Sequence, residues 1–300
     1  MNVRSLLYGL LLTAATSVSA APFTTFYVVA HPDDWQLFMN PNAYKDVRNT
    51  SNKTVIVHTT AGDAGAGIGS NGRQHPYYLA REEGALRALR FSKSANGAIG
   101  QQVLNQGART INGRSITRFA SGDGRAVMYF LRLPDGNPNG TGYPTTGSQS
   151  LQKLKTGNTP INAVDGSATY GSWSDLTATL AGLIRAEAGG SAGVWLNIAE
   201  TDAGKNPGDH SDHRYTSLAV QEARGLVSTC IDQALYVEYH TNNRPANISG
   251  DNLVNNAAVW GATTSGIADF DHPSTFDGSH NAWLSRNYFR VIDGIGTCAF

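Results

Sequence analysis

Short apolar runs alternate along the chain with longer segments in which apolar residues recur at helical spacing. Five of the runs predict β-strands, at residues 26–30, 54–60, 126–133, 193–198 and 234–240. Uninterrupted apolar runs of this length are typical of parallel strands that are covered on both faces. Helical patterns lie between them, at residues 79–89, 174–184 and 210–227. This alternation predicts an α/β fold, a Rossmann-like layered α/β/α arrangement with a mostly parallel sheet.

Three segments lack such periodicity. Residues 92–125 are polar and are expected to be irregular. Residues 136–172, rich in Gly, Asn, Thr and Ser, are predicted to form a long loop over the functional site, because long structureless segments in compact domains are usually functional or disordered. The tail at about 241–300 is predicted to be an irregular extension whose aromatic rings mostly pack on the core. Residues 21–300 are expected to form one domain, since about 280 residues suit a single large α/β core.

The first 20 residues have the pattern of a targeting segment. Arg4 precedes an apolar stretch at 6–15, and small residues occupy positions 18–20. This pattern predicts a cleaved signal peptide, and the apolar stretch is too short to span a membrane. We therefore expect a secreted or periplasmic protein with no integral membrane segment after cleavage; a membrane anchor is the alternative.

Charge and cysteine content narrow the classes of partner. Lys plus Arg equal Asp plus Glu, at 23 each, so the chain lacks the excess of positive charge that is typical of proteins that bind nucleic acid or an anionic membrane surface. A neutral, hydroxyl-rich ligand fits this balance better than a polyanion. The two cysteines, Cys230 and Cys298, predict a disulfide in an exported chain, and two separate thiols are the alternative.

Candidate chemistry begins where the first predicted strand ends. His31, Asp33 and Asp34 lie just beyond its carboxyl end, and ligands of open α/β sheets bind in that crevice. A second polar motif, NPGDHSDH at 206–213, contains His210 and His213, whose spacing of three places both rings on one face of a helix. Together the two motifs offer three metal ligands and an acid or base on either side, which is what a catalytic zinc site needs.

Four motifs in this order carry a resemblance to a known family: AHPDD at 30–34, GDAG at 62–65, LPDG at 133–136 and HSDH at 210–213. From about residue 23 to 240 the chain resembles the PIG-L/LmbE family of zinc-dependent N-deacetylases. The resemblance implies one Zn²⁺ per chain. It further implies a role for each of five residues: His31, Asp34 and His213 as metal ligands, Asp33 as general base, and His210 as the group that stabilises the oxyanion or protonates the amine. Trp35 and Ser211 stand where the family often has Glu and Pro, and neither position binds the metal.

The function that the resemblance implies is removal of N-acetyl groups from an N-acetylglucosamine-type sugar, glycoconjugate or polysaccharide. Two alternatives stay open. One is a zinc hydrolase that acts on another amide or ester, because a fold does not fix the substrate. The other is a glycan-binding relative without catalytic activity.

Other polar residues near the two motifs have more than one interpretation. Asp63, Asp135 and His240 lie at or just after predicted strand ends and could approach the site, but each also suits a structural role in a turn or in packing. Asp212 is predicted to orient a histidine ring rather than to bind metal. Arg81 lies in the helical pattern at 79–89 and is given no catalytic role.

Overall fold

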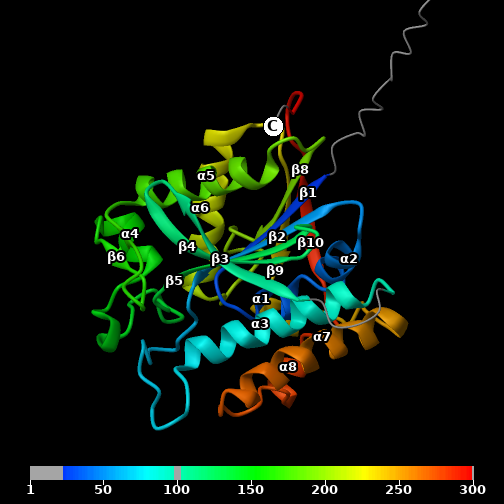
Figure 1. Ribbon diagram of the computed structural model, residues 1–300, viewed down its shortest axis with the longest axis horizontal. Helices are drawn as coiled ribbons and strands as arrows, with labels where there is room; N and C mark the ends of the chain where they lie inside the picture. The colour runs from blue at the N-terminus through cyan, green and yellow to red at the C-terminus, as the bar shows by residue number, and fades with distance from the viewer. Residues whose placement is uncertain (1–22, 98–102, 299–300) are drawn as a thin grey trace, which may run out of the picture.

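The computed structural model describes residues 23–97 and 103–298. The predicted signal peptide at 1–20 lies outside the described residues. No helix within these ranges is both long enough and apolar enough to cross a membrane. The described chain builds one large sheet with helices on both of its faces, which confirms the predicted α/β class (Figure 1).

The large sheet has eight strands in the order β10-β9-β8-β1-β2-β5-β4-β3. The five central strands, β9 to β5 in this order, pair in parallel, and β10, β4 and β3 are added at the edges in antiparallel pairs. The bounds of the eight strands are β1 Thr24–Val29, β2 Lys53–Thr60, β3 Leu104–Ile111, β4 Arg114–Ser121, β5 Ala126–Leu133, β8 Val194–Ala199, β9 Asp232–Val237 and β10 Tyr288–Ile292.

Helices cover both faces of this sheet (Figure 1). One face packs against α5 (Trp173–Ala188) and α6 (Ser211–Val227). The other face packs against α1 (Asp34–Phe38), α2 (Asn42–Arg48), α3 (Tyr77–Ser94) and α7 (Gly250–Asp269). The short elements are α4 (Leu151–Gly157), α8 (Gly278–Asn281), the 3₁₀ turns η1 (Pro144–Thr146) and η2 (Tyr239–Asn243), and a two-stranded sheet of β6 (Ile161–Asn162) and β7 (Thr169–Tyr170).

The apolar run of β1 follows directly from its place in the layers. Phe26 and Val28 enter the core under α5 and α6, whereas Tyr27 and Val29 enter the core on the opposite face. All four side chains are almost completely buried. A strand buried on both faces cannot alternate apolar with polar residues, and this is why the run is readable as a central parallel strand.

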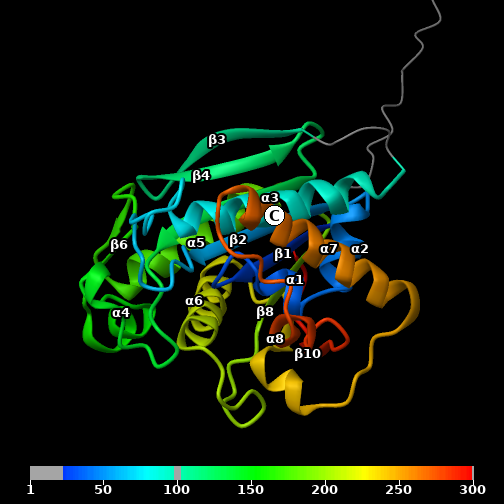
Figure 2. The ribbon, with the colours of Figure 1, turned by 90° about the horizontal axis from the view of Figure 1, so that it is seen from below.

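The expectation that residues 92–125 are irregular is wrong. β3 and β4 form an antiparallel hairpin at one edge of the molecule, and Figure 2 shows it at that edge, along the side of the central strands. The turn between them, Asn112-Gly113, has positive φ at both residues, which is the conformation that two-residue hairpin turns favour. Most of β3 is exposed, so the hairpin carries no long apolar run.

The predicted long loop at 136–172 is only partly irregular. It contains η1, β6, β7 and α4, whose N-cap Ser150 accepts a hydrogen bond from the backbone N–H of Lys153. Leu151 and Leu154 of α4 are fully buried in the core. This helix is only seven residues long, which is too short for its periodicity to be read from the sequence.

The expectation of an irregular tail at 241–300 is also wrong. α7 runs for 20 residues along α3 in Figure 2, and β10 extends the main sheet beside β9. The two helices approach closely because Gly84 and Gly266 face each other. As predicted, Cys230 and Cys298 form a disulfide, which ties the segment after β10 to the start of β9.

Candidate metal centre

The candidate site lies at the carboxyl edge of the sheet, next to the junction of β1 and β8. The chain leaves β1 toward β2 and later returns to β8 on the other side of β1, so the strand order reverses between these two strands. Such a reversal opens a crevice in which α/β proteins bind their ligands. Residues 31–34 follow β1 and residues 206–213 follow β8, so the fold brings the two predicted motifs together.

Three predicted metal ligands meet in a compact triangle. His31 Nδ1 lies 3.1 Å from His213 Nε2, His213 Nε2 lies 3.2 Å from Asp34 Oδ1, and His31 Nδ1 lies 3.5 Å from Asp34 Oδ1. Bonds of about 2.0–2.1 Å in a tetrahedral zinc site place neighbouring ligand atoms ~3.3 Å apart. All three side chains are buried, and their donor atoms can hold one metal ion.

Local structure fixes each corner of this triangle. The backbone N–H of His31 donates to Asp34 Oδ2 at 2.7 Å, which closes the turn between β1 and α1. Asp34 is the first residue of α1, and His213 lies in the first turn of α6. Rigid elements therefore set the relative positions of the ligands, as a metal site requires.

Two carboxylates lie at the Nδ1 side of the His213 ring and fix its orientation. Its Nδ1 lies 2.6 Å from Glu238 Oε2 and 2.9 Å from Asp209 Oδ1, so the Nδ1 hydrogen points at carboxylates and the lone pair of Nε2 is free to bind a metal ion. Burial raises the pKa of Glu238 to about 8. Neither carboxylate was predicted from the sequence to belong to the site. Asp209 lies four residues before His213 but outside α6, whose N-cap is His210, so helical spacing alone does not predict this contact.

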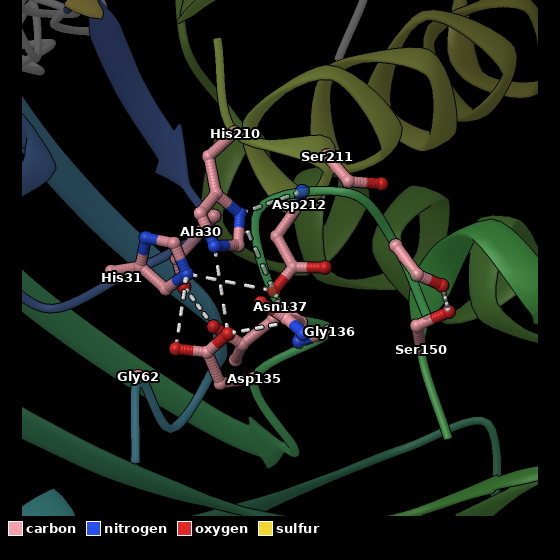
Figure 3. A network of polar contacts seen from close by, with 12 residues as sticks. Ala30, His31, Gly62, Asp135, Gly136, Asn137, Ser150, His210, Ser211 and Asp212 are labelled. Atoms are coloured by element: carbon pink, nitrogen blue, oxygen red, sulfur yellow. Dashed lines mark hydrogen bonds and ion pairs between the residues drawn. The ribbon is translucent and has the colours of Figure 1, made fainter. Parts of the chain in front are cut away.

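The other ring nitrogen of His31 faces a second pair of carboxylates (Figure 3). His31 Nε2 lies 3.5 Å from Asp212 Oδ2 and 3.9 Å from Asp135 Oδ2. Asp212 Oδ2 also accepts a hydrogen bond from the backbone N–H of Gly136 at 2.7 Å. This geometry fits the predicted role of Asp212 in orienting a histidine ring, and it brings Asp135 into the site.

The electrostatic field of the site favours positive charge at the triangle. Burial alone lowers the pKa of His31, but the carboxylates of Asp34, Asp212 and Asp135 outweigh burial and raise that pKa to about 10. Likewise, burial lowers the pKa of His213, and its carboxylate neighbours, Asp34 first among them, raise that pKa well above its ordinary value. Two imidazole nitrogens and a carboxylate oxygen in such a field suit a divalent cation.

His210 is held as a neutral hydrogen-bond donor. Its Nδ1 accepts the backbone N–H of Asp212 at 3.1 Å, so the ring hydrogen is on Nε2. Nε2 lies 3.5 Å from Asp135 Oδ1, and a dashed line joins the two residues in Figure 3. Burial, together with positive charge on His31 and His213, lowers the pKa of His210. The ring can therefore donate a hydrogen bond to an anionic oxygen without itself carrying a charge.

Asp33 points into the cavity in front of the triangle. Its carboxylate is 17% exposed and pairs with Arg81 Nη2, while Arg81 Nη1 donates to the carbonyl of Gly62 at 2.7 Å. Arg81, which was given no catalytic role from the sequence, is nearly buried and lines the cavity beside Asp33. The sequence could not place Arg81, because its partner lies 48 residues away on another element.

Two other candidates have structural roles. Asp63 is fully buried and accepts hydrogen bonds from the backbone N–H groups of Gly67 and Asp135, so it fixes the loop that presents Asp135. His240 does not end a strand, because β9 stops at Val237 and His240 lies in η2. Its neighbour Tyr239, rather than His240, lines the cavity at the triangle.

This cavity, called the metal cavity below, has a volume of about 170 Å³. Its lining combines the polar groups of the site with aromatic side chains. Trp283 and Tyr239 are stacked in this lining, with ring centroids 5.4 Å apart. His280, whose Nδ1 lies 2.9 Å from both carboxylate oxygens of Asp277, belongs to the same lining. The C-terminal segment thus contributes directly to the candidate site.

Comparison with known proteins assigns no family to the chain. No family model and no curated protein matches it. Among solved structures, it is similar to GalB, the 4-carboxy-2-hydroxymuconate hydratase from Pseudomonas putida KT2440, with 14% sequence identity and a TM-score of 0.41. That match covers 87% of this chain and 81% of the hydratase.

Proposed function

We propose that the protein is a metal-dependent hydrolase that removes the acetyl group from an N-acetylated sugar or glycan of the N-acetylglucosamine type. The observation that carries this proposal is the triangle of His31 Nδ1, Asp34 Oδ1 and His213 Nε2, with edges of 3.1–3.5 Å. Three protein ligands leave one tetrahedral position open, which is the mark of a catalytic rather than a structural zinc site. The motifs around the triangle resemble those of the PIG-L/LmbE deacetylases.

The donor atoms fit Zn²⁺, and His31, Asp34 and His213 would hold it. When bound, such an ion lowers the pKa of an attacking water toward neutrality and polarises a carbonyl oxygen. Side chains of the metal cavity would carry out the other steps. Some transfer a proton, and others stabilise the charge that develops during the reaction.

Asp33 is the proposed general base. Its pairing with Arg81 fixes the direction of the carboxylate, so that it can accept a proton from water inside the cavity. A C–O bond then forms at the amide carbonyl carbon and the C–N bond breaks. The proton taken by Asp33 passes to the departing amine nitrogen, and acetate and a free amine are released.

His210 is the proposed donor to the oxyanion that develops on the carbonyl oxygen. Its neutral ring carries the hydrogen on Nε2, and Asp135 beside Nε2 favours that tautomer. A donor that is fixed before the reaction stabilises developing charge without reorganisation, and loss of one such donor typically costs about 10²–10³ in rate. This geometry favours oxyanion stabilisation over protonation of the amine as the role of His210.

The composition supports a sugar over a charged polymer as substrate. The chain has no net charge, and the lining of the metal cavity includes the stacked rings of Tyr239 and Trp283. Aromatic faces bury the apolar C–H faces of sugar rings, while the polar groups of the lining offer partners to their hydroxyls. The disulfide and the predicted signal peptide support an extracytoplasmic glycan.

The test combines metal analysis with acetate release. Purified protein is expected to hold about one divalent ion per chain and to release acetate from N-acetylglucosamine oligomers. His213→Ala and Asp34→Ala should lose both properties, because two remaining ligands make too weak a site. His240→Ala, a histidine outside the triangle, serves as the matched control. Full metal content in both ligand variants would contradict the proposal, and glycan binding without acetate release would favour the non-catalytic alternative.

A further inference from the structure

A second cavity, of about 210 Å³, lies beside the metal cavity. The two cavities are neighbours because His210 belongs to the lining of both. The wall of the second cavity comes from the start of α6, from the segment between β8 and α6, from the segment that follows β5, and from α4. The segment after β5 is the one that the sequence predicts to lie over the site.

Hydrogen bonds fix this wall against the start of α6. The backbone N–H of Ser211 donates to the carbonyl of Pro138 at 2.9 Å, and Ser211 Oγ donates to Gln152 Oε1 at 2.9 Å. In Figure 3 the side chain of Ser211 points away from His31, toward the side on which Ser150 lies. Ser150 Oγ in turn donates to the carbonyl of Gly140. The second cavity is therefore a preformed space bounded by ordered backbone.

The lining of the second cavity combines the carboxylates of Glu200 and Asp209 with unused hydrogen-bond donors. Gln152 and Tyr215 both line it, and neither the amide nitrogen of Gln152 nor the hydroxyl of Tyr215 has a hydrogen-bond partner within the described ranges. Arg214 lines it as well, and its Nε donates to the carbonyl of Thr201, which leaves its other nitrogens for a ligand. Amide, phenol and guanidinium donors match hydroxyl and carbonyl oxygens. A long acyl chain has no acceptors for these donors, so its binding here would leave them without hydrogen bonds.

We propose that the substrate is an oligosaccharide that spans both cavities, with the acetylated unit in the metal cavity and a neighbouring sugar unit in the second cavity. The inference rests on the proposed function and specifies its substrate class: a chain of at least two units rather than a free monosaccharide or an acylated lipid precursor. His210, which lines both cavities, lies beside the linkage between the two units. Binding of the neighbouring unit adds affinity that a single sugar cannot obtain.

Chain length and two side-chain changes test this inference. Acetate release is measured on N-acetylglucosamine and on its β-1,4-linked tetramer, and binding of both is measured by calorimetry. Wild-type protein should prefer the tetramer by tenfold or more in kcat/KM. Tyr215→Phe and Gln152→Leu should each lower kcat/KM for the tetramer by about fivefold, as expected for one lost hydrogen bond to a ligand, and leave the monomer within twofold. Gln152→Leu also removes the acceptor of Ser211 Oγ, so Ser211→Ala, which loses that bond and keeps the Gln152 amide, is its control.

Gln221→Leu makes the same chemical change in α6, ten residues beyond Ser211 and about 15 Å away. It should leave kcat/KM unchanged for both the monomer and the tetramer. The inference is overturned if wild-type protein shows no preference for the tetramer, or if the two variants weaken monomer and tetramer equally. Calorimetry separates it from the proposed function. Absence of acetate release from every oligomer refutes deacetylation, whereas tetramer binding that depends on Tyr215 and Gln152 still decides whether the second cavity holds a sugar.

Discussion

Adjacent carboxylates at the end of β1 have different surroundings and should have different roles. Asp34 is buried in the triangle, whereas Asp33 pairs with Arg81 in the cavity. Asp33→Asn should keep its metal and lose roughly 10²–10⁴ in turnover, the usual contribution of a positioned general base. Asp34→Asn should lose metal affinity first and activity as a consequence. Metal content and acetate release are measured for both variants, with and without added zinc.

Added zinc distinguishes the two roles. It should restore part of the activity of Asp34→Asn by mass action, and it should do nothing for Asp33→Asn, which already holds the ion. The opposite pattern, rescue of Asp33→Asn alone, would reverse the assignment of base and ligand.

The sequence predicted the residues of the triangle better than the residues that support it. His31, Asp34 and His213 lie in two short motifs, and these motifs are visible without a structure. Arg81 and Glu238 act on Asp33 and His213 from other elements. Their positions depend on how α3 and β9 pack, and no spacing along the chain encodes that packing.

His58, a fully buried residue of β2, should make the protein less stable in mild acid. Burial lowers the pKa of His58 to about 3, and its ring is stacked on Phe130 with centroids 4.8 Å apart. The unfolded chain takes up a proton near pH 6.5, whereas the folded protein stays neutral there. The stability that this residue contributes is therefore complete above about pH 6.5 and is lost as the pH falls from there toward 3.

Urea unfolding at pH 7 and pH 5 with a chelator present measures this contribution. Between these two values, wild-type protein should lose roughly 2 kcal/mol that His58→Phe does not lose. The chelator removes metal binding as a source of pH dependence in both proteins. Equal losses in the two proteins would mean that His58 is protonated in the folded state.

At the scale of elements, the strands that are buried on both faces were predicted from the sequence, and the strands and the helix that are half exposed were missed. Every central strand was predicted within a few residues, because a doubly covered strand must be apolar throughout. β3 and β10, at the two edges of the sheet, are partly exposed, and α7 is rich in Asn, Gly and Thr, which are weak helix formers. Contact with α3 stabilises α7, and periodicity within α7 alone does not reveal that contact.

The α3–α7 contact gives a prediction with a control in the same helix. A Cβ on Gly266 would lie 2.7 Å from the Cα of Gly84, so Gly266→Ala should push the helices apart and cost about 1–3 kcal/mol. A Cβ on Gly261, also in α7, would meet no atom of a neighbouring element within 4 Å, and Gly261→Ala should stabilise the helix by up to about 1 kcal/mol. Thermal unfolding of both variants tests the contact. A gain in melting temperature for Gly266→Ala would show that the helices do not pack as closely as described.

At the scale of the whole molecule, the strand order decides where the site forms. Residues 31–34 and 206–213 are far apart in the chain, and they meet because β8 returns to the free side of β1. The sequence predicted that the sheet is mostly parallel, but the order of the strands depends on which way each helix crosses over the sheet, and local sequence patterns do not record that. The C-terminal segment completes the architecture: β10 closes one edge, and Trp283 lines the metal cavity.

The disulfide that anchors this C-terminal segment should stabilise the fold, and its removal should not change metal binding. Cys230 and Cys298 are 68 residues apart, and a closed loop of that length is worth about 4 kcal/mol in the chain-entropy model. The double variant Cys230→Ser/Cys298→Ser should therefore unfold at a lower urea concentration than wild-type protein. Its metal content should stay near one ion per chain under native conditions, because all three ligands precede residue 230. Reductant should destabilise wild-type protein to the same extent and leave the double variant unchanged. If reductant shifts neither unfolding curve, the cross-link contributes nothing, and packing of α7 and β10 alone holds the C-terminal segment in place.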